Sequence, residues 1–399
     1  MAAADLALFC PGPGEPADGF ARVDRACSAL GRPCLHIASE GGAIAVGPLF
    51  IPGRTSCFRC SRRFLACFDD GERGTRLAAG EPAPWMSALA AAVAVDELAA
   101  FFDRGANLRV ASVSAITLYD RAQRYHNIVE RSYTPALTPC PVCGPPARAA
   151  QAARPDAAFI VGSQRSGTTV LGLALGAHER VELVDEDRAY VALAGEPVDA
   201  TGMTIYKVPN WTAAVGTFAA HFPGGGFLFL RRPAVQVAAS MLTLRGFAGT
   251  SWAEHFAGIE TRVAIAGFSD ERARAALERH LRRAESDTVL MAALCAIAKQ
   301  ALVSEYRRRG LRVLEVDYER LVIEPEATLA AVLDFLGIAH GERALRAGPG
   351  PRGATIGQTE RGRPIDAGSL DKYRRVLGTG ALARIAELET SIRGELAGG

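Results

Sequence analysis

Lysine is the residue type that this sequence most nearly lacks. Of its 45 lysine and arginine residues, the only lysines are Lys207, Lys299 and Lys372. Chemistry that needs an ammonium group therefore has three possible places in the chain. Net charge is also low, because 45 basic and 43 acidic residues leave +2. This balance argues against a dedicated nucleic-acid-binding protein, which usually carries a strongly basic domain.

Long hydrophobic runs and an evident secretory signal are absent too. The most apolar stretch, residues 87–102, is interrupted by Asp96 and Glu97 and is too short to cross a bilayer. Residues 1–5 lack a cationic lead into an apolar segment. These absences predict a cytoplasmic protein without membrane contact. The chain has 399 residues, 49% of them hydrophobic, which is enough for two domains with buried cores.

A segment rich in proline and alanine, residues 144–157, divides the chain. Eight of the nine cysteines precede it, and it has no hydrophobic periodicity, which is typical of a linker. We predict a smaller α+β zinc-binding domain over residues 1–145, a linker over 146–157 and an α/β domain over 158–399. In the last of these, strand-like and helix-like runs alternate, which predicts a parallel sheet with flanking helices.

Strands and helices are expected as follows. In the front part, strands are expected at residues 34–37 and 43–46 and a helix at 87–102. In the second part, strands are expected at 159–162, 226–230 and 311–316, and helices at 166–175, from about 233, and at 326–336 before Gly337.

A phosphate-binding loop is predicted directly after the strand at 159–162. The segment Gly162-Ser-Gln-Arg-Ser-Gly-Thr-Thr169 lies between that strand and an apolar helical run. Backbone N–H groups and the positive end of a helix converge there, which suits an anion. The spacing matches a Walker A loop, but Thr168 stands where a kinase or ATPase needs lysine. A kinase-like phosphotransferase and an ordinary strand-to-helix turn are the alternatives.

This loop and three later segments, residues 227–240, 316–322 and 363–373, resemble the sulfotransferases that use 3′-phosphoadenosine-5′-phosphosulfate (PAPS). Among them the chain looks most like the tyrosylprotein sulfotransferases, over about residues 158–396. The resemblance implies a P-loop-type sheet and a PAPS co-substrate. It places the 5′-phosphosulfate on the residues Arg165, Ser166, Gly167, Thr168 and Thr169.

The same resemblance implies which residues hold the rest of the nucleotide. An arginine after a strand and a downstream serine hold the 3′-phosphate in this family. The family's spacing between this arginine and the serine, here Ser240, selects Arg232 as the 3′-phosphate residue, whereas its Arg-Asp-Pro motif selects Arg231. We favour Arg232. Tyr318 is expected near the nucleotide, and Lys372 is expected to reach it from the closing segment.

Two residues are expected to carry the reaction. In the tyrosylprotein branch, a glutamate at the distance of Glu186 from the loop arginine is the proposed general base. Lys207 matches the family's Lys-x-Pro segment, whose lysine stabilises the leaving phosphate. A solvated acidic loop is the alternative for Glu186, and His178 and His221 are the other candidate bases, with a structural role favoured for His178.

The front part carries two C-x₂-C pairs, and their four cysteines suit a closed, structural Zn²⁺ site. These cysteines are Cys57, Cys60, Cys140 and Cys143. Disulfides are the alternative, which a cytosolic location disfavours. The other front-part cysteines are interpreted as small core residues. These are Cys10, Cys27, Cys34 and Cys67.

Residues 46–60 with 140–144 resemble the zinc-bearing half of ThiF/E1-like proteins, and most closely the leader-peptide-binding type found beside azole-forming enzymes. Residues 1–45 are too few for a Gly-rich nucleotide-binding half, so no adenylation activity is expected. The resemblance implies docking of a precursor peptide or a biosynthetic partner protein; a purely structural role is the alternative. Together, the two parts predict sulfuryl transfer to a tyrosine or another hydroxyl of a ribosomally made peptide. A non-catalytic peptide-binding scaffold is the remaining alternative.

Overall fold

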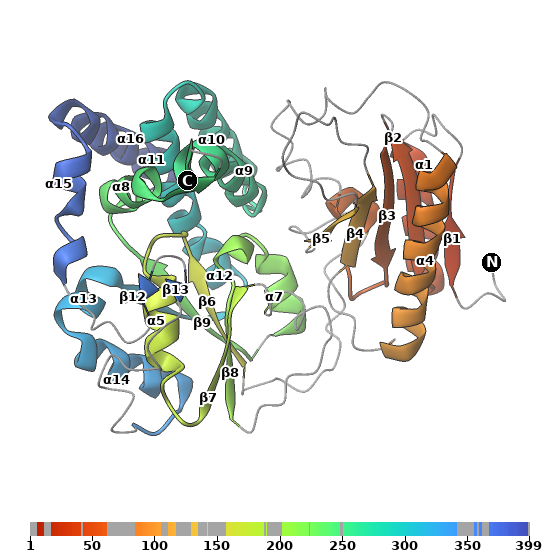
Figure 1. Ribbon diagram of the computed structural model, residues 1–399, viewed down its shortest axis with the longest axis horizontal. Helices are drawn as coiled ribbons and strands as arrows, with labels where there is room; N and C mark the ends of the chain where they lie inside the picture. The colour runs from red at the N-terminus through yellow and green to blue at the C-terminus, as the bar shows by residue number, and fades with distance from the viewer. Residues whose placement is uncertain are drawn as a thin grey trace. The chain divides into compact units, whose positions relative to one another are not determined.

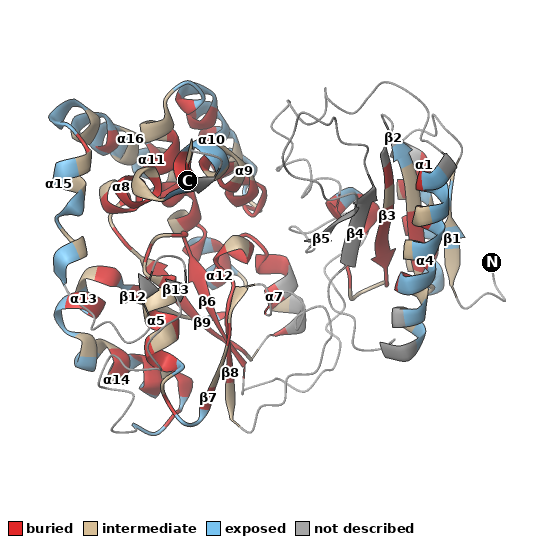
Figure 2. Ribbon diagram, viewed as in Figure 1, coloured by how far each residue is buried: buried red, intermediate tan, exposed pale blue. Residues whose placement is uncertain are grey.

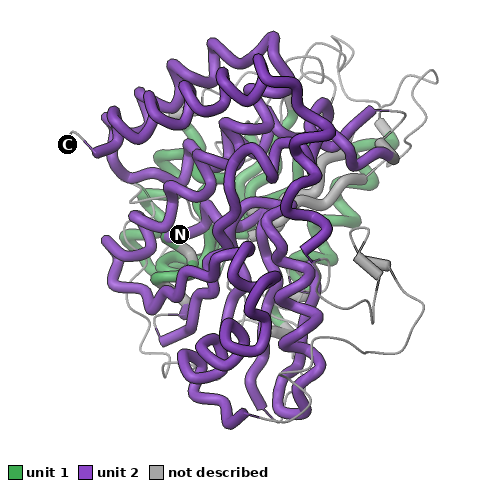
Figure 3. Tube along the Cα trace, turned by 90° about the vertical axis from the view of Figure 1, so that its left-hand side faces the viewer, with its two compact units in different colours: residues 1–151, 190–197, 216–221 green, residues 152–189, 198–215, 222–399 purple. Residues whose placement is uncertain are grey.

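Two five-stranded sheets form the centres of two separate units in the computed structural model (Figures 1 and 3). One unit comprises residues 1–151, 190–197 and 216–221, and the other comprises residues 152–189, 198–215 and 222–399. The structure describes residues 6–11, 17–40, 43–61, 84–104, 111–116, 129–134, 142, 157–186, 189, 202–222, 224–247, 250–340, 355–356, 359–360 and 367–397.

The sheet of the second unit is entirely parallel, in the order β12-β9-β6-β8-β7. Its strands are β6 (Ala157–Gly162), β7 (Val181–Val184), β8 (Met203–Lys207), β9 (Gly226–Arg231) and β12 (Arg312–Asp317). All six residues of the central strand β6 are buried, as Figure 2 shows. A strand buried on both faces reads as a continuous apolar run, and this explains why Ala157–Gly162 lacks polar alternation. The predicted α/β class is confirmed.

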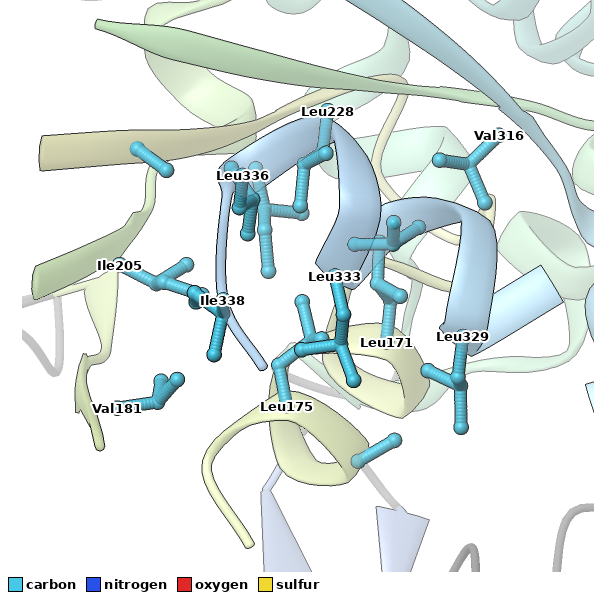
Figure 4. Packing of buried hydrophobic residues seen from close by; sticks show 14 of the residues in the cluster. Leu171, Leu175, Val181, Ile205, Leu228, Val316, Leu329, Leu333, Leu336 and Ile338 are labelled. Carbon is cyan, nitrogen blue, oxygen red and sulfur yellow. The ribbon is translucent and has the colours of Figure 1, made fainter. Parts of the chain in front are cut away.

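Aliphatic side chains fill one face of this sheet. Ile160 of β6 and Leu228 of β9 point into a buried cluster that Figure 4 shows. Three helices pack over this face of the sheet: α5 (Thr168–Leu175), α13 (Tyr318–Ile323) and α14 (Pro325–Leu336). Leu171, Leu333 and Leu336 from these helices complete the cluster.

Aromatic rings fill the opposite face, because alternate residues of a strand point to opposite sides. Phe159 of β6 stacks between Tyr206 of β8 and Phe227 of β9, with ring centroids 5.3 and 5.1 Å away. Tyr306 of α12 (Val303–Arg308) meets Phe227 and Phe229 edge-on. The sheet is thus buried on both sides, which fixes the register of its strands.

Five helices pack together in the same unit: α8 (Ala234–Thr243), α9 (Gly258–Ala266), α10 (Glu271–Ala284), α11 (Thr288–Ala301) and α16 (Thr379–Ala397). α11 lies against the other four. Asp270 and Asp287 cap α10 and α11 by accepting hydrogen bonds from backbone N–H groups of the first turn.

The stretch Thr288–Arg308, which includes α11, has a mean hydropathy of 1.4 over its most apolar window and is long enough to cross a membrane by length and composition alone. However, 67% of that window is buried inside the protein. Packing in the core therefore accounts for its apolar character. The sequence analysis singled out residues 87–102 and did not consider this second apolar stretch.

The described residues between and beyond these elements also form shorter ones: η2 (Pro209–Trp211), α7 (Val215–His221), β10 (Arg245–Phe247), β11 (Thr250–Ser251), η3 (Ala253–Ala257), β13 (Thr355–Ile356), β14 (Thr359–Glu360), η4 (Ala367–Ser369) and α15 (Lys372–Val376). The strands and helices predicted in the second part are all present. α5 begins two residues later than expected, because Gly167 has a φ of 102° and stands outside the helix. α14 ends as predicted, with Gly337 at φ 70°.

The first unit has a mixed sheet in the order β1-β2-β3-β4-β5, in which only β1 and β2 run parallel. Its elements are β1 (Ala7–Phe9), α1 (Ala17–Leu30), β2 (Cys34–Glu40), β3 (Ala43–Phe50), α4 (Pro84–Arg104), β4 (Ala111–Ile116) and β5 (Val129–Thr134). Met86 and Ala90 of α4 pack with Leu35, Val46 and Leu49 of the sheet. This arrangement is of the α+β type that we predicted.

The cysteines of the first unit divide into buried and exposed ones. Cys27 and Cys34 are fully buried core residues, as predicted. Cys10 is exposed, contrary to the prediction, because it follows the end of the short strand β1. Cys67 lies outside the described residues, as do residues 146–156 of the predicted linker, which stays a prediction there. Ala157, the last residue assigned to the linker, instead begins strand β6.

Candidate functional site

The site predicted from the sequence lies where the parallel strands of the second unit end. β6 leads into the loop 162–169, and its neighbours β8 and β9 end at Lys207 and Arg231. β7 ends one residue before Asp185, and β12 ends one residue before Tyr318. Because the strands are parallel, their carboxyl ends share one edge of the sheet, the usual place for a ligand in open α/β folds.

The loop after β6 turns sharply, and two glycines with positive φ, Gly162 and Gly167, make the turn possible. Gly162 has a φ of 123°, and a Cβ there would lie 2.7 Å from the carbonyl oxygen of Leu230. Arg165 has a φ of 66°, which is uncommon for a residue other than glycine. Ser166 Oγ donates to the carbonyl oxygen of Ser163 at 2.5 Å. Among the described residues no side chain caps α5, so its first N–H groups suit an anion.

Two arginines meet beside this loop. Arg165 Nε donates to Ser240 Oγ at 3.2 Å, and Arg232 Nη1 donates to the carbonyl oxygen of Arg165 at 2.9 Å. The Arg232 guanidinium lies 4.0 Å from the centre of the Tyr318 ring. A Cβ on Gly167 would lie 2.6 Å from Tyr318 Cε2. The loop and the residues predicted to hold the 3′-phosphate are therefore in direct contact.

Arg231 points elsewhere. Its Nη1 lies 2.6 Å from Glu315 Oε2 of the neighbouring strand β12, and its side chain is 43% exposed. Arg232 is buried, and its Nε donates to Gln236 Oε1 at 3.0 Å. The structure therefore brings Arg232, rather than Arg231, to the loop, in agreement with the spacing argument.

Positive charge accumulates at this place. Desolvation lowers the pKa of both Arg165 and Arg232, and Arg165 lowers that of Arg232 further by repulsion. Lys372, at the start of α15, also has a lowered pKa, first through desolvation and then through repulsion from Arg165, Arg232 and Arg375. Cations that repel one another at a single place favour the binding of an anion.

Lys207 and Glu186, the two predicted catalytic residues, are in contact. Lys207 Nζ lies 2.6 Å from Glu186 Oε1 and 2.9 Å from Asp185 Oδ1. It also donates to Thr169 Oγ1 at 3.3 Å, which joins this pair to the start of α5. The side chain of Lys207 is 3% exposed and that of Glu186 is 36% exposed. Glu186 is thus partly open to solvent, while the ammonium group of Lys207 is buried.

The alternative bases do not share this position. His178 Nε2 donates to the carbonyl oxygen of Ala339 at 3.0 Å, and its Nδ1 accepts a hydrogen bond from the Arg180 N–H at 3.0 Å. Both ring nitrogens are therefore engaged with the backbone, which supports the structural role that we favoured for His178. The side chain of His221 lies outside the described part of the structure.

Sequence reasoning missed two residues that hold this site together. Gln236 accepts from Arg232, and its Nε2 donates to Glu319 Oε1 at 2.6 Å. Ser369 accepts a hydrogen bond from Arg232 Nη2 at 3.2 Å through its carbonyl oxygen, and its Oγ lies 2.7 Å from the Tyr318 hydroxyl. Gln236 could have been found, because it lies in the first turn of α8, four residues after Arg232. Nothing local in the sequence marks Ser369.

The predicted zinc ligands are only partly described. Cys57 and Cys60 are buried in the first unit, whereas Cys140 and Cys143 lie outside the described residues. Within the described ranges no group of three or more His, Cys, Asp or Glu side chains is placed to hold a metal ion. Val142, which stands between the second pair of cysteines, packs in the same buried cluster as Cys57 and Cys60.

Comparison with known proteins gives a family for part of the chain. Residues 182–342 match the model of a family described as "Sulfotransferase family". This range includes Glu186, Lys207, Arg232, Ser240 and Tyr318. Residues 182–342 therefore belong to a domain of the sulfotransferase family. No curated protein matches the chain.

Three solved structures are similar at low identity. The sulfotransferase domain from the curacin biosynthetic pathway is 16% identical, with a TM-score of 0.38, and the match covers 58% of this chain and 96% of that one. The sulfotransferase domain of the Synechococcus PCC 7002 olefin synthase is 18% identical, with a TM-score of 0.37, and the match covers 60% of this chain and 96% of that one. A sulfotransferase from Alicyclobacillus acidocaldarius is 14% identical, with a TM-score of 0.36, and the match covers 61% of this chain and 95% of that one.

Proposed function

We propose that the second unit transfers a sulfuryl group from PAPS to a hydroxyl group. One observation carries the proposal: Glu186 and Lys207, 2.6 Å apart, lie beside a P-loop-type turn at which Arg165, Arg232 and Lys372 come together. A carboxylate, an ammonium group and a set of cations are what the reaction requires. The match to the sulfotransferase family over residues 182–342 supports the assignment.

The donor is proposed to bind through its two phosphate-bearing ends. The N–H groups at the start of α5 and the loop 165–169 would hold the 5′-phosphosulfate, and Arg232 with Ser240 would hold the 3′-phosphate. A guanidinium is suited to this task, because it offers two parallel donors to one phosphate. Gln236 orients Arg232 through Nε. Nη1 and Nη2 each donate one hydrogen bond to a backbone carbonyl, and the second N–H of each would be donated to the ligand.

The chemistry proposed for the bound donor is a direct displacement at sulfur. The bond between sulfur and the bridging oxygen of the 5′-phosphate breaks as the acceptor oxygen bonds to sulfur, and the acceptor proton passes to Glu186. Lys207 stabilises the negative charge that develops on the departing phosphate. The exposed position of Glu186 lets an acceptor reach it, and the buried position of Lys207 strengthens its electrostatic effect.

Binding of adenosine 3′,5′-bisphosphate, measured by calorimetry, tests the donor site. Arg232→Ala should weaken binding about 10- to 100-fold, the effect of losing a charged hydrogen-bond donor. Arg231→Ala is the matched control and should bind as the wild type does, because Arg231 pairs with Glu315 instead. If the wild type gives no heat, or if the two variants are equally impaired, the donor assignment is wrong.

Turnover of labelled PAPS tests the catalytic assignment on the same material. Glu186→Gln should lower kcat by about 10²- to 10⁴-fold, as expected for a lost general base, and should leave bisphosphate binding intact. A variant that keeps wild-type kcat would remove Glu186 from the mechanism.

We also propose that the acceptor is a hydroxyl of a ribosomally made peptide, with a tyrosine as the first choice, and that the first unit docks this peptide or a biosynthetic partner. The support is the resemblance of residues 46–60 and 140–144 to leader-peptide-binding proteins of the ThiF-like type. Low net charge agrees with a partner other than nucleic acid.

A structural Zn²⁺ ion held by the four cysteines of the two C-x₂-C pairs is part of the proposal. Val142 supports it, because a residue between Cys140 and Cys143 packs in the buried cluster of Cys57 and Cys60. Four thiolates around Zn²⁺ leave no open position, so the metal would stabilise the fold and not react. We propose a cytoplasmic location, where thiols stay reduced and available to a metal.

A further inference from the structure

Lys299 is the third lysine of the chain, and the proposed reaction does not use it directly. It lies in α11, and its side chain is fully buried. Its Nζ lies 2.5 Å from Glu260 Oε2 of α9 and 2.5 Å from Gln164 Oε1, and 3.1 Å from the carbonyl oxygen of Pro209. An ammonium group has three hydrogens to donate, and these three acceptors use them all.

Stability alone is a weak reason for such a group. Replacing a buried ion pair by apolar side chains of similar volume is often neutral or stabilising, because both charges must be desolvated. α11 is otherwise apolar at its buried positions, so a leucine at residue 299 would suit the helix. The acceptors other than Glu260 therefore indicate what this lysine does.

Those acceptors belong to the two segments that carry the site. Gln164 is in the loop after β6, directly before Arg165. Pro209 follows Lys207 by two residues at the end of β8. A hydrogen bond from Gln164 Nε2 to Asn210 Oδ1 joins the same two segments a second time.

We propose that Lys299 is a positioning residue that sets the distance between the anion-binding loop and the segment of Lys207. The inference rests on the proposed sulfuryl transfer and deepens it. Lys299 holds the loop through the Gln164 side chain and the Lys207 segment through the Pro209 carbonyl, so that neither can move without the other. Arg165 and Lys207, which are both proposed to act on the bound phosphosulfate, then keep the spacing that the displacement needs.

Three variants separate this role from a contribution to folding. Glu260→Gln removes the negative charge but leaves Lys299 its bonds to Gln164 and Pro209, so the melting temperature should fall while the spacing is kept. Lys299→Met combined with Glu260→Leu removes both charges, so the fold should be nearly as stable as the wild type while the link is lost. Lys299→Met alone leaves Glu260 buried without its partner and should be the least stable.

The expected kinetics do not follow stability. With PAPS and a phenolic acceptor, the double variant should lose at least tenfold in kcat, since misplacement by about 1 Å can cost about 10²-fold. Its KM for PAPS should rise less than kcat falls, because the contacts of Arg232 are kept. Glu260→Gln should keep kcat. If kcat follows the melting temperature across the series, or if the double variant turns over like the wild type, the inference is wrong.

Hydrogen–deuterium exchange gives a readout that does not depend on activity. Peptides covering residues 162–169 and 207–211 should exchange faster in the double variant and at the wild-type rate in Glu260→Gln. Unchanged exchange in the double variant overturns the positioning role. If the wild type does not turn over PAPS, the proposed function fails, and the exchange measurement still decides whether Lys299 couples the two segments.

Discussion

Lys372 combines exposure with a strongly positive neighbourhood. Its pKa is lowered from 10.5 by desolvation first and by the repulsion of Arg165 and Arg232 next. A bound phosphate would reverse this repulsion and raise the pKa again. Binding of the nucleotide and protonation of Lys372 should therefore support each other.

This linkage predicts the pH dependence of nucleotide affinity. While Lys372 is protonated in the free protein, affinity should stay constant; as the pH rises through its lowered pKa, the free protein loses that proton and affinity should fall. Calorimetry with adenosine 3′,5′-bisphosphate across the range below pH 10.5, the ordinary lysine value, measures the effect. Above about pH 7 the phosphates are fully ionised and add little to the slope.

Lys372→Arg is the control for this experiment. Arginine stays charged throughout the range, so the affinity of the variant should be nearly independent of pH. A wild-type slope that persists in the variant would show that another group titrates and would take Lys372 away from the nucleotide.

Single residues also show which contacts of the site can be predicted from the sequence and which cannot. The spacing to Ser240 selected Arg232 over Arg231, and Arg232 is the one that contacts the loop, because neighbouring residues at a strand end point to different sides. That Arg232 holds a 3′-phosphate stays a prediction. Gln164, Pro209 and Lys299 could not be connected in this way. They lie far apart along the chain and meet only through the packing of α9 and α11 against the loop.

Gly167 joins the loop 162–169 to helix α5 and packs against the ring of Tyr318. Its φ of 102° and the neighbouring Tyr318 ring leave no room for a side chain. Gly167→Ala should destabilise the protein by at least about 1 kcal/mol through backbone strain alone, or a few degrees in melting temperature. Displacement of Tyr318 should also disturb Arg232 and weaken bisphosphate binding.

Gly394→Ala is the matched control for that substitution. Gly394 lies in α16, and a Cβ there meets nothing within 4 Å. Alanine in a helix is favoured over glycine by roughly 0.5–1 kcal/mol, so this variant should be slightly more stable, with unchanged binding. Equal stability of the two variants in thermal unfolding would contradict the tight packing of Gly167 on Tyr318.

Elements were easier to predict than their ends. β6 and β9 are continuous apolar runs and α14 ends at a glycine, so these signals are local. The start of α5 was missed by two residues, because the conformation of Gly167 is set by the loop geometry. The apolar composition of Thr288–Arg308 can be read from the sequence and was overlooked. That this stretch is packed inside the protein is seen only from the helices around α11.

The division into two units predicts that loss of the proposed zinc site in the first unit leaves nucleotide binding by the second unit unchanged. Purified protein should carry about one Zn²⁺ per chain, and Cys57→Ser or Cys140→Ser should lose the metal and lower the melting temperature. Bisphosphate affinity should not change, because all the residues proposed to bind it belong to the second unit. Metal analysis and calorimetry on the same samples measure both effects.

Cys10→Ser is the control for the zinc experiment, because Cys10 is exposed and outside the two C-x₂-C pairs. It should keep the metal in full. Zinc contents that do not differ among the three variants would exclude the cysteine site, and a disulfide between the pairs would then be examined by mass under non-reducing conditions.

The scarcity of lysine has a practical side for anyone who handles this protein. Lys299 and Lys207 are shielded from reagents, whereas Lys372 is exposed and its lowered pKa makes its amine more nucleophilic near neutral pH. Dyes or resins that couple to amines should therefore react with Lys372 as well as with the α-amino group of the chain, and a label on Lys372 should block the proposed nucleotide site.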